Sequence, residues 1–535
     1  MKENKSLVKR IMAALAAGTI LIAVPMSGCN SNNNNEKKDS SGESAVSGDT
    51  SDSNSNSTIV ATSEHYSIPF SVFQYLYNYN YKSFVSNYGT QLIDSSKPLN
   101  EQYYDQDNKI SWHDYFITST EDYITYIVCF AEGGLAHGMQ LTADEKKEIE
   151  DGFKEFESAA AQNSKSVDEY IKEVYGDDVT KDDIINIQTM SKIGLKYRNE
   201  LYKSYKLTDA DYEKKYNEDK TSYQIADYYS YTFSYTETNE DGTSQTVNEE
   251  TKKKMEENAK ALSNSKSGKE FNDYLTKYLK ANPSLVPVNS TSSESSLTEE
   301  EFNNLLNSYV ESCYHAKSAY DDSNDLSKWV FDESRKANET KVEDTGSGYT
   351  VVLVDKPLYR NETGTRNVRH ILITSDSITN EDGSEVTDAQ VKAEAERILK
   401  EWNSKDSTEE RFAELAKQYS MDPGSKANGG IYENVEPGQM VPAFNDWLFD
   451  KNRKPGDTGI VKTDYGYHIM FYIGEGLKSW QVKIDSALRD EKLAADYEGL
   501  KKDYPIEFDK EAVDKAEIKK EEESSDSSAA NLAQQ

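Results

Sequence analysis

The hydrophobic pattern of this chain changes near residue 220, from the period of a helix to the period of a strand. Before that point apolar side chains recur every three or four residues, as in Phe73, Leu76, Tyr77, Tyr81 and Phe84. This spacing places them along one face of a helix. We therefore expect residues 59–220 to form a helical domain.

Helix starts in this region carry their own signals. A hydroxyl side chain followed three residues later by an acid can satisfy the free backbone amides at the start of a helix. Three such pairs occur: Thr142 with Glu145, Ser166 with Glu169, and Thr208 with Asp211. The histidines His65, His113 and His137 stand alone in this region, and we expect surface or hydrogen-bonded core positions for them.

Two later stretches repeat one succession of a strand pattern, an Asn-Glu-Asp-Gly turn and a helical run. They lie at 228–235, 239–242 and 251–262, and again at 368–373, 380–383 and 389–402. Further along, Trp329–Lys336 resembles Trp447–Lys454, and Gly348–Val351 aligns with Gly466–Ile469. We interpret the two stretches as copies of an internal duplication.

The copies differ at polar positions. Thr350 stands where the later copy has His468, and Tyr229 stands close to the position of His370. The block at 420–424 has no convincing counterpart within 284–296, and His315 is expected to lie in a helix. The earlier copy is therefore expected to be a scaffold and not a second active centre.

Charge and cysteine content exclude several classes of protein. The 535 residues include 95 acids and 61 bases, for a net charge of −34, which would repel a phosphate backbone. We therefore expect no nucleic-acid partner. The cysteines are Cys29, Cys129 and Cys313, which provide neither a disulfide framework nor zinc-ligand spacing. Cys129 lies in an apolar run and is expected to be buried.

The N-terminus has the pattern of an export signal. Lysines and an arginine precede the apolar run 11–24, and Ser27-Gly28-Cys29 follows it. This resembles a bacterial lipobox, so we expect residues 1–28 to be a signal peptide and Cys29 to be lipidated. Residues 29–58 are polar and are expected to form a disordered tether.

The C-terminal region reads as a long charged helix from Trp480 to about Tyr504, followed by a short strand at 505–508. We expect residues 477–518 to pack on the N-terminal helices. Residues 519–535 are rich in acids and serine, and are expected to be a disordered tail.

The later copy resembles the parvulin family of peptidyl-prolyl isomerases, especially its bacterial exported members. The matching pieces are His370-Ile371-Leu372, Phe412–Ala416, Tyr419-Ser420, Asp422–Ser425, Gly429-Gly430, Gly438–Pro442 with Phe444, and Gly466–Ile469. With the lipobox and the flanking helices, the whole chain is similar to foldase lipoproteins of the PrsA type.

This resemblance implies an α+β protein in which the N- and C-terminal segments build a helical chaperone-like domain. Two tandem parvulin-like domains, each a small antiparallel sheet flanked by helices, would occupy residues 221–360 and 361–476. The first of them would be degenerate. The resemblance implies no cofactor and no metal ion.

The resemblance also assigns roles to individual residues. The catalytic set would be His370, Asp422, Thr463 and His468, with the two histidines facing each other and Asp422 at a position where some relatives carry cysteine. The proline ring would lie against Met440 and Phe444. Tyr432 would line the same pocket, at a position where relatives commonly have leucine.

We expect a membrane-anchored extracytoplasmic prolyl isomerase that assists the folding of exported proteins containing X-Pro bonds. Residues 374–388 hold no basic cluster, which favours general X-Pro peptides over phosphorylated ones. One alternative is a non-catalytic holdase chaperone that uses both copies as a cradle. A more distant alternative is a solute-binding lipoprotein, which would need two lobes of alternating strands and helices that this chain lacks.

Overall fold

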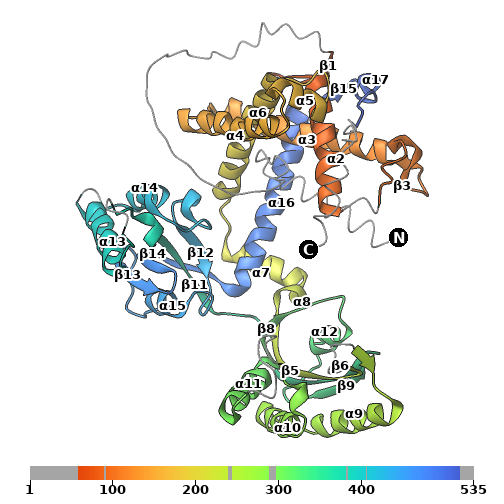
Figure 1. Cartoon of the computed structure of the whole chain (residues 1–535), viewed down its shortest axis with the longest axis vertical. Helices are drawn as coiled ribbons and strands as arrows, with labels where there is room; N and C mark the ends of the chain where they lie inside the picture. The colour runs from red at the N-terminus through yellow and green to blue at the C-terminus, as the bar shows by residue number, and fades with distance from the viewer. Residues whose placement is uncertain are drawn as a thin grey trace. The chain divides into compact units, whose positions relative to one another are not determined.

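The computed structural model describes residues 58–88, 92–238, 244–287, 297–380, 384–404 and 407–518. The expected signal peptide, Cys29, nearly all of the tether and the acidic tail lie outside the described residues. The chain divides into two compact units. Unit 1 combines the residues up to 206 with those from 489 onward, and unit 2 comprises residues 207–488 (Figure 1). In the parts that the structure describes, no helix combines the length and apolar character needed to cross a membrane.

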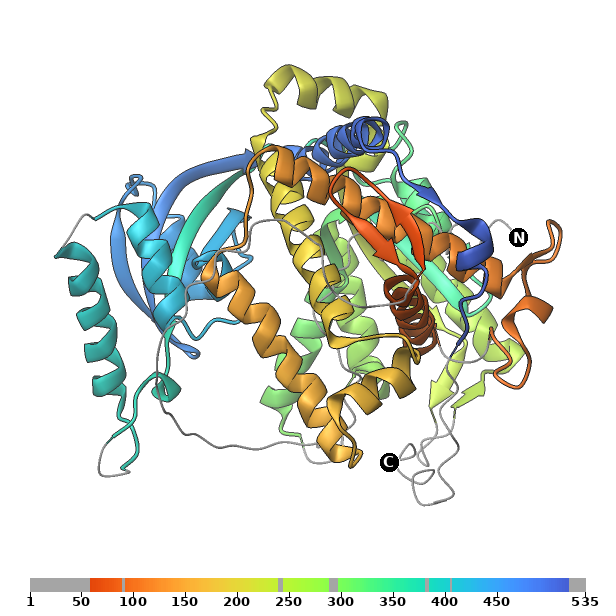
Figure 2. The same ribbon diagram turned by 90° about the horizontal axis from the view of Figure 1, so that it is seen from above.

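Unit 1 is mainly helical. Its helices are α2 (Phe70–Tyr88), α3 (Trp112–Ala136), α4 (Ala143–Gln162), α5 (Val167–Tyr175) and α6 (Lys181–Ser204), with the short α17 (Lys510–Val513). The expected caps at Thr142 and Ser166 are confirmed, since both form complete capping boxes. Helices α3 and α6 lie side by side (Figures 1 and 2). Gly194 permits this approach, because a Cβ there would press on the backbone oxygen of Ile127 in α3.

Short strands interrupt the helices of unit 1, so the expectation of helices throughout 59–220 is wrong in part. The strands are β1 (Ile59–Thr62), β2 (Ser67–Pro69), β3 (Tyr103–Asp105), β4 (Ile110–Ser111) and β15 (Glu507–Phe508). The antiparallel sheet runs in the order β15-β1-β2, with Ala61 opposite Phe508. A strand whose partner lies at the far end of the chain leaves little local signal, which explains the miss. The short strand expected at 505–508 is confirmed.

The first sheet of unit 2 is antiparallel, in the order β8-β5-β10-β9. Its strands are β5 (Ile225–Ser234), β8 (Tyr314–Ala319), β9 (Thr340–Asp344) and β10 (Gly348–Tyr359). One face packs against α9 (Glu249–Leu262), α10 (Gly268–Ala281) and α11 (Glu299–Ser312), and the other against α12 (Asp325–Val330). Along the chain, the small hairpin β6 (Thr236–Thr238) with β7 (Ser244–Thr246) follows β5, and the helices α7 (Asp209–Glu218) and α8 (Lys220–Tyr223) precede it.

The second sheet repeats this plan in the order β12-β11-β14-β13. Its strands are β11 (Gly364–Ile373), β12 (Ile431–Val435), β13 (Thr458–Thr463) and β14 (Gly466–Lys478). Helices α13 (Asp388–Asn403) and α14 (Glu409–Tyr419) cover one face, and α15 (Pro442–Leu448) covers the other (Figure 1). The long helix α16 (Ser479–Asp503) follows β14. The expected α+β fold with small antiparallel sheets flanked by helices is confirmed. The finer domain boundaries stay predictions.

Strand register relates the two copies residue by residue. Tyr349 of β10 pairs with Phe233, as Tyr467 of β14 pairs with Ile373. Counting along the strands, Thr350 takes the place of His468, as expected from the sequence. Ser230 takes the place of His370, and Tyr229, which was expected close to that position, is its neighbour along the strand and projects from the other sheet face.

The position of His315 corrects one expectation from the sequence. It lies in strand β8, not in a helix, because α11 ends at Ser312. It pairs with Tyr228, as Tyr432 pairs with Val368, and therefore occupies the position of Tyr432. The expected lack of a counterpart to the 420–424 block concerns 284–296, most of which lies outside the described residues.

Candidate functional site

Two histidines lie on one face of the second sheet. His468 of β14 sits opposite Leu372, two residues along β11 from His370, so both imidazoles project from the same face. Their rings stack with centroids 5.2 Å apart, and the two Nδ1 atoms are 3.0 Å apart. Both residues are buried, at 3% and 5% exposure. The alternation of the strands thus converts two distant sequence positions into one hydrogen-bonded pair.

Asp422 completes the polar part of the site from the loop that follows α14. Its Oδ2 accepts hydrogen bonds from His370 Nε2 at 2.8 Å, from the Tyr432 hydroxyl at 3.0 Å and from the hydroxyl of Ser425. The backbone amide of Gly424 donates to the other carboxylate oxygen, Oδ1. The carboxylate is therefore held by four donors.

Ser420 ties this loop to strand β11. Its hydroxyl oxygen accepts from the amide of Leu372 at 3.1 Å and from the amide of Asp422 at 3.2 Å. The amide of Met421 donates to the carbonyl of Leu372 at 2.8 Å. Asp422 thereby keeps a fixed position relative to the strand that carries His370.

Burial and hydrogen bonding set the charges of these groups. Burial alone would raise the pKa of the Asp422 carboxyl, but the bonds from Ser425, His370 and Tyr432 outweigh it and lower that pKa to about 2. Burial, reinforced by the neighbouring His370, lowers the pKa of His468 to about 4. Burial also lowers the pKa of His370, against the opposing effect of Asp422. At neutral pH the site therefore holds one carboxylate and two neutral imidazoles.

This charge state determines the direction of each hydrogen bond in the series that runs from Asp422 through the two histidines to Thr463. Ionised Asp422 can only accept, so His370 carries its proton on Nε2 and has a bare Nδ1. That Nδ1 must accept from the Nδ1–H of His468, which leaves Nε2 of His468 as an acceptor. The hydroxyl of Thr463, 2.8 Å away, donates to it. A single tautomer of each histidine therefore satisfies all three of these hydrogen bonds.

An apolar cluster adjoins the imidazoles. Phe444 of α15 is 2% exposed and places its ring edge-on to both histidines, with centroids 5.5 Å from each. The ring of Tyr432 lies 5.4 Å from that of His370. Met440 packs against the same cluster. The structure thus brings together all seven residues that the sequence singled out in this domain.

Two further residues belong to the site, although sequence reasoning did not select them. Ser425 is 1% exposed and contacts both Asp422 and His370 Nε2. Gly430 accepts a hydrogen bond at its carbonyl from the amide of His370, and its φ of 73° favours glycine. Both lay inside motifs that the sequence matched. Their polar or conformational roles were visible only once the loop was folded against β11.

The earlier copy places different groups on the corresponding face. The Ser230 hydroxyl and His315 Nε2 lie 2.7 Å apart, at the positions of His370 and Tyr432. Thr350 bonds to Thr232 at 2.8 Å, where the later copy has the second imidazole. The earlier copy keeps the sheet and replaces the histidine pair.

Comparison with known proteins places residues 351–472 in one family. They match the family model of the PPIC-type PPIase domain, the parvulin type of prolyl isomerase. Foldase protein PrsA 1 of Listeria innocua serovar 6a is 29% identical over 175 residues, which cover 32% of this chain and 53% of that protein. Foldase protein PrsA of a Geobacillus species is 47% identical over 75 residues, covering 14% of this chain and 27% of that protein.

The chain spans about half the length of the first of these relatives. Among solved structures, PrsA from Bacillus subtilis is 17% identical to this chain, with a TM-score of 0.18. The match covers 64% of this chain and 91% of the PrsA chain. A likeness at that score adds nothing to the assignment. The family assignment therefore rests on the domain that carries the histidine pair.

Proposed function

We propose that this chain, whose residues 351–472 match the family model of the PPIC-type PPIase domain, catalyses cis–trans exchange of X-Pro bonds in unfolded exported proteins. The observation that carries the proposal is the hydrogen-bonded set of Asp422, His370 and His468 beside the buried ring of Phe444. It combines an apolar surface for a proline ring with a fixed negative charge.

The reaction itself requires no bond to be made or broken. Rotation about an X-Pro bond is opposed by amide resonance, with a barrier of about 18–20 kcal/mol. A site lowers that barrier by holding the proline ring in an apolar pocket and favouring the twisted amide electrostatically. Phe444 and Met440 would hold the ring, with Tyr432 beside them. Asp422 would lie near the substrate carbonyl, whose oxygen carries more negative charge in the planar amide.

The two histidines act as supports in this scheme. Because both are neutral and saturated with hydrogen bonds, neither has a free proton or lone pair to act as a general acid or base. Their role is to hold Asp422 in position from beneath, with Thr463 fixing the tautomer at the far end.

The proposal extends to location. The basic start, the apolar run 11–24 and the Gly28-Cys29 pair support export, cleavage before Cys29 and lipidation of that cysteine. The lipid would anchor the protein to the outer face of a cell membrane, with residues 30–58 as spacer. Exported chains reach this face unfolded, and slow prolyl exchange can limit their folding.

The test is catalysed exchange in a proline tetrapeptide, measured by NMR exchange spectroscopy with the full chain and with residues 361–476. We expect acceleration by the wild type and a strong loss in Asp422→Ala. His137→Ala, a substitution in unit 1, serves as the control for nonspecific effects. Correctly folded wild type without detectable catalysis would reject the enzyme proposal.

A holdase chaperone remains the second candidate, because the earlier copy keeps its framework with Ser230 and Thr350 in place of the histidines. Such a protein needs the surfaces of both copies and no catalysis. It predicts that Asp422→Ala and His468→Ala leave suppression of client aggregation intact. Loss of suppression in either variant, with unchanged circular dichroism, would reject it.

A further inference from the structure

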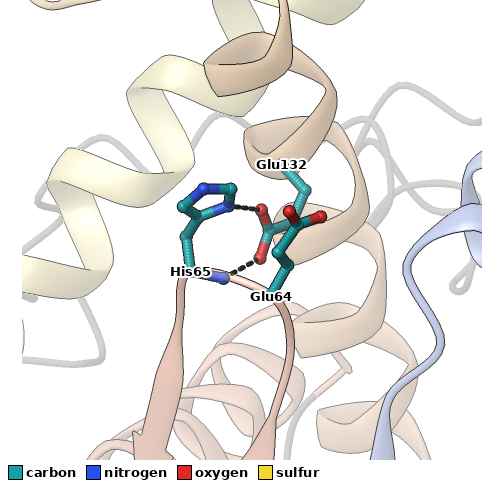
Figure 3. Close-up of side chains that lie close together, drawn as sticks. All are labelled: Glu64, His65 and Glu132. Carbon is teal, nitrogen blue, oxygen red and sulfur yellow. Dashed lines mark hydrogen bonds and ion pairs between the residues drawn. The ribbon is translucent and has the colours of Figure 1, made fainter.

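A group of potential metal ligands lies in unit 1, outside the isomerase domain. Glu132 belongs to helix α3, while Glu64 and His65 lie in the turn between strands β1 and β2 (Figure 3). One ligand atom from each residue lies within 4.8 Å of those of the other two. The side chains converge on one point at the edge of the helix.

The buried carboxylate of Glu132 organises this group. Its Oε2 accepts from Nδ1 of His65 at 2.6 Å, and its Oε1 accepts from the His65 backbone amide at 2.8 Å and from the Ser63 hydroxyl. The Glu132 side chain is 0% exposed, whereas that of His65 is 51% exposed. A fully buried anion is thus paired with a partner that faces solvent.

The charges at this point suit a cation. A buried carboxylate is costly unless it is paired with a cation or coordinates a metal ion. His65 is the ion-pair partner of Glu132, and the pair supplies one nitrogen and one oxygen ligand atom. The second carboxylate, Glu64, adds repulsion by approaching the first. Convergence of two carboxylates and one imidazole is an arrangement that a divalent cation would stabilise.

We propose that Glu64, His65 and Glu132 bind one divalent transition-metal ion, for which Zn²⁺ is the best match. Zinc accepts imidazole nitrogen together with carboxylate oxygen, and commonly binds three protein ligands with water in the fourth position. Magnesium and calcium prefer ligand sets made of oxygen alone. The exposed side of the group, at Glu64 and His65, provides the route of entry and the place for water.

Coordination would require small local changes. The ion needs the lone pair of His65 Nδ1, so the proton that this atom donates to Glu132 moves to Nε2 or to solvent. Glu132 keeps its bonds from Ser63 and from the backbone amide, which hold Oε1 while Oε2 faces the ion. The bound ion would link the β1–β2 hairpin to α3 and stabilise unit 1.

The experiment is Zn²⁺ titration of the chelator-treated full chain by calorimetry, with thermal unfolding as a second readout. We expect one tight site per chain, and a rise in the unfolding temperature of unit 1 on binding. Glu64→Gln and His65→Gln each remove a direct ligand and should weaken this site by more than the roughly 10- to 100-fold typical for an outer-shell partner. Glu64 is exposed, so its substitution tests the ligand set without disturbing the core.

His137→Gln is the matched control, because His137 is an exposed histidine at the end of the same helix and lies outside the group. The His137→Gln variant should bind Zn²⁺ with the same affinity as the wild type. Absence of a tight site in the wild type would overturn the proposal, as would equal affinity in Glu64→Gln and His65→Gln. Loss of the site in His468→Asn would assign the ion to the isomerase domain instead. The isomerase proposal is unaffected by any of these results.

Discussion

His370 and His468 are joined through their Nδ1 atoms, 3.0 Å apart, and only one of those atoms can carry the proton. Because Asp422 is ionised, the proton belongs to His468. The protonation state of Asp422 is thereby coupled, through the two imidazoles, to the hydroxyl of Thr463.

Direct observation of the tautomers is the first prediction. Long-range proton–nitrogen NMR spectra near neutral pH should show two neutral imidazoles, with His370 protonated at Nε2 and His468 at Nδ1. The measurement needs no substrate. A protonated imidazolium at either position, or the opposite tautomers, would contradict the hydrogen-bond directions derived from Asp422.

The stability of the isomerase domain should depend on pH through His468. Its pKa is about 4 in the folded protein and near 6.5 when unfolded, so between these values the unfolded chain binds more protons. Stability should therefore be constant above about pH 6.5 and fall by roughly 3 kcal/mol as the pH drops to about 4. The lowered pKa of His370 acts in the same direction.

Urea unfolding of wild type and His468→Asn across this range is the measurement. The variant should be less stable at neutral pH but should show a flatter pH dependence. Asp422 contributes in a separate pH range. Its stabilisation is lost only as the pH falls below the pKa of the carboxyl in the unfolded chain, toward the folded pKa of about 2. Parallel curves for the two proteins would exclude His468 as the origin.

Thr463→Val tests the last hydrogen bond of the series that begins at Asp422. It preserves the shape of the side chain and removes the hydroxyl that donates to Nε2 of His468. An unsatisfied buried acceptor costs about 1–3 kcal/mol, and the His468 tautomer should lose its definition in NMR spectra. Isomerase activity should fall with it. Thr463→Ser keeps the donor and should stay close to wild type in both measurements.

Tyr432→Phe separates the phenol from the ring. The variant loses the hydrogen bond to Asp422 and keeps the ring beside His370. We expect a loss of about 1 kcal/mol of stability and a rise in the pKa of Asp422, followed by carboxyl carbon NMR. Tyr465→Phe, at an exposed tyrosine in the turn before β14, is the matched control and should change neither quantity.

Gly430→Ala should disturb strand β11. Gly430 has φ +73°, and an added Cβ would collide with the carbonyl oxygen of His370. We expect destabilisation by more than about 2 kcal/mol and reduced isomerase activity. Gly438 has φ +85° with nothing within 4 Å of an added Cβ, so Gly438→Ala should cost only about 1 kcal/mol. Similar unfolding curves for the two variants would argue against the steric explanation.

The isomerase domain was the most predictable part of the chain. Its seven site residues were assigned through motifs that resemble those of the parvulin family, and the structure brings all seven together. Exact register was harder: Tyr229 was expected close to the position of His370, which Ser230 occupies, and His315 was wrongly expected in a helix. Local pattern could not determine either position, because register depends on pairing with strands that are distant in the chain.

Long-range pairing also hid the other features that the sequence missed. Strand β1 depends on β15, and His65 looked isolated because Glu132 lies 67 residues further along. The sequence showed Ser425 and Gly430 only as members of matched motifs, without a role in the site. Their contacts with Asp422 and His370 follow from the fold of one loop.

Because β1 pairs with β15, the sheet of unit 1 can be completed only after nearly the whole chain has emerged. Unit 2 is an uninterrupted stretch of chain, so it can fold as soon as residue 488 has emerged. The small sheet of unit 1 must wait, because the strand that completes it lies at Glu507–Phe508. While the chain is still being delivered, the half-built unit would expose the edge of β1 to other strands. The part of the chain that emerges first is thus among the last to be completed, and its open strand edge is exposed to wrong partners until then.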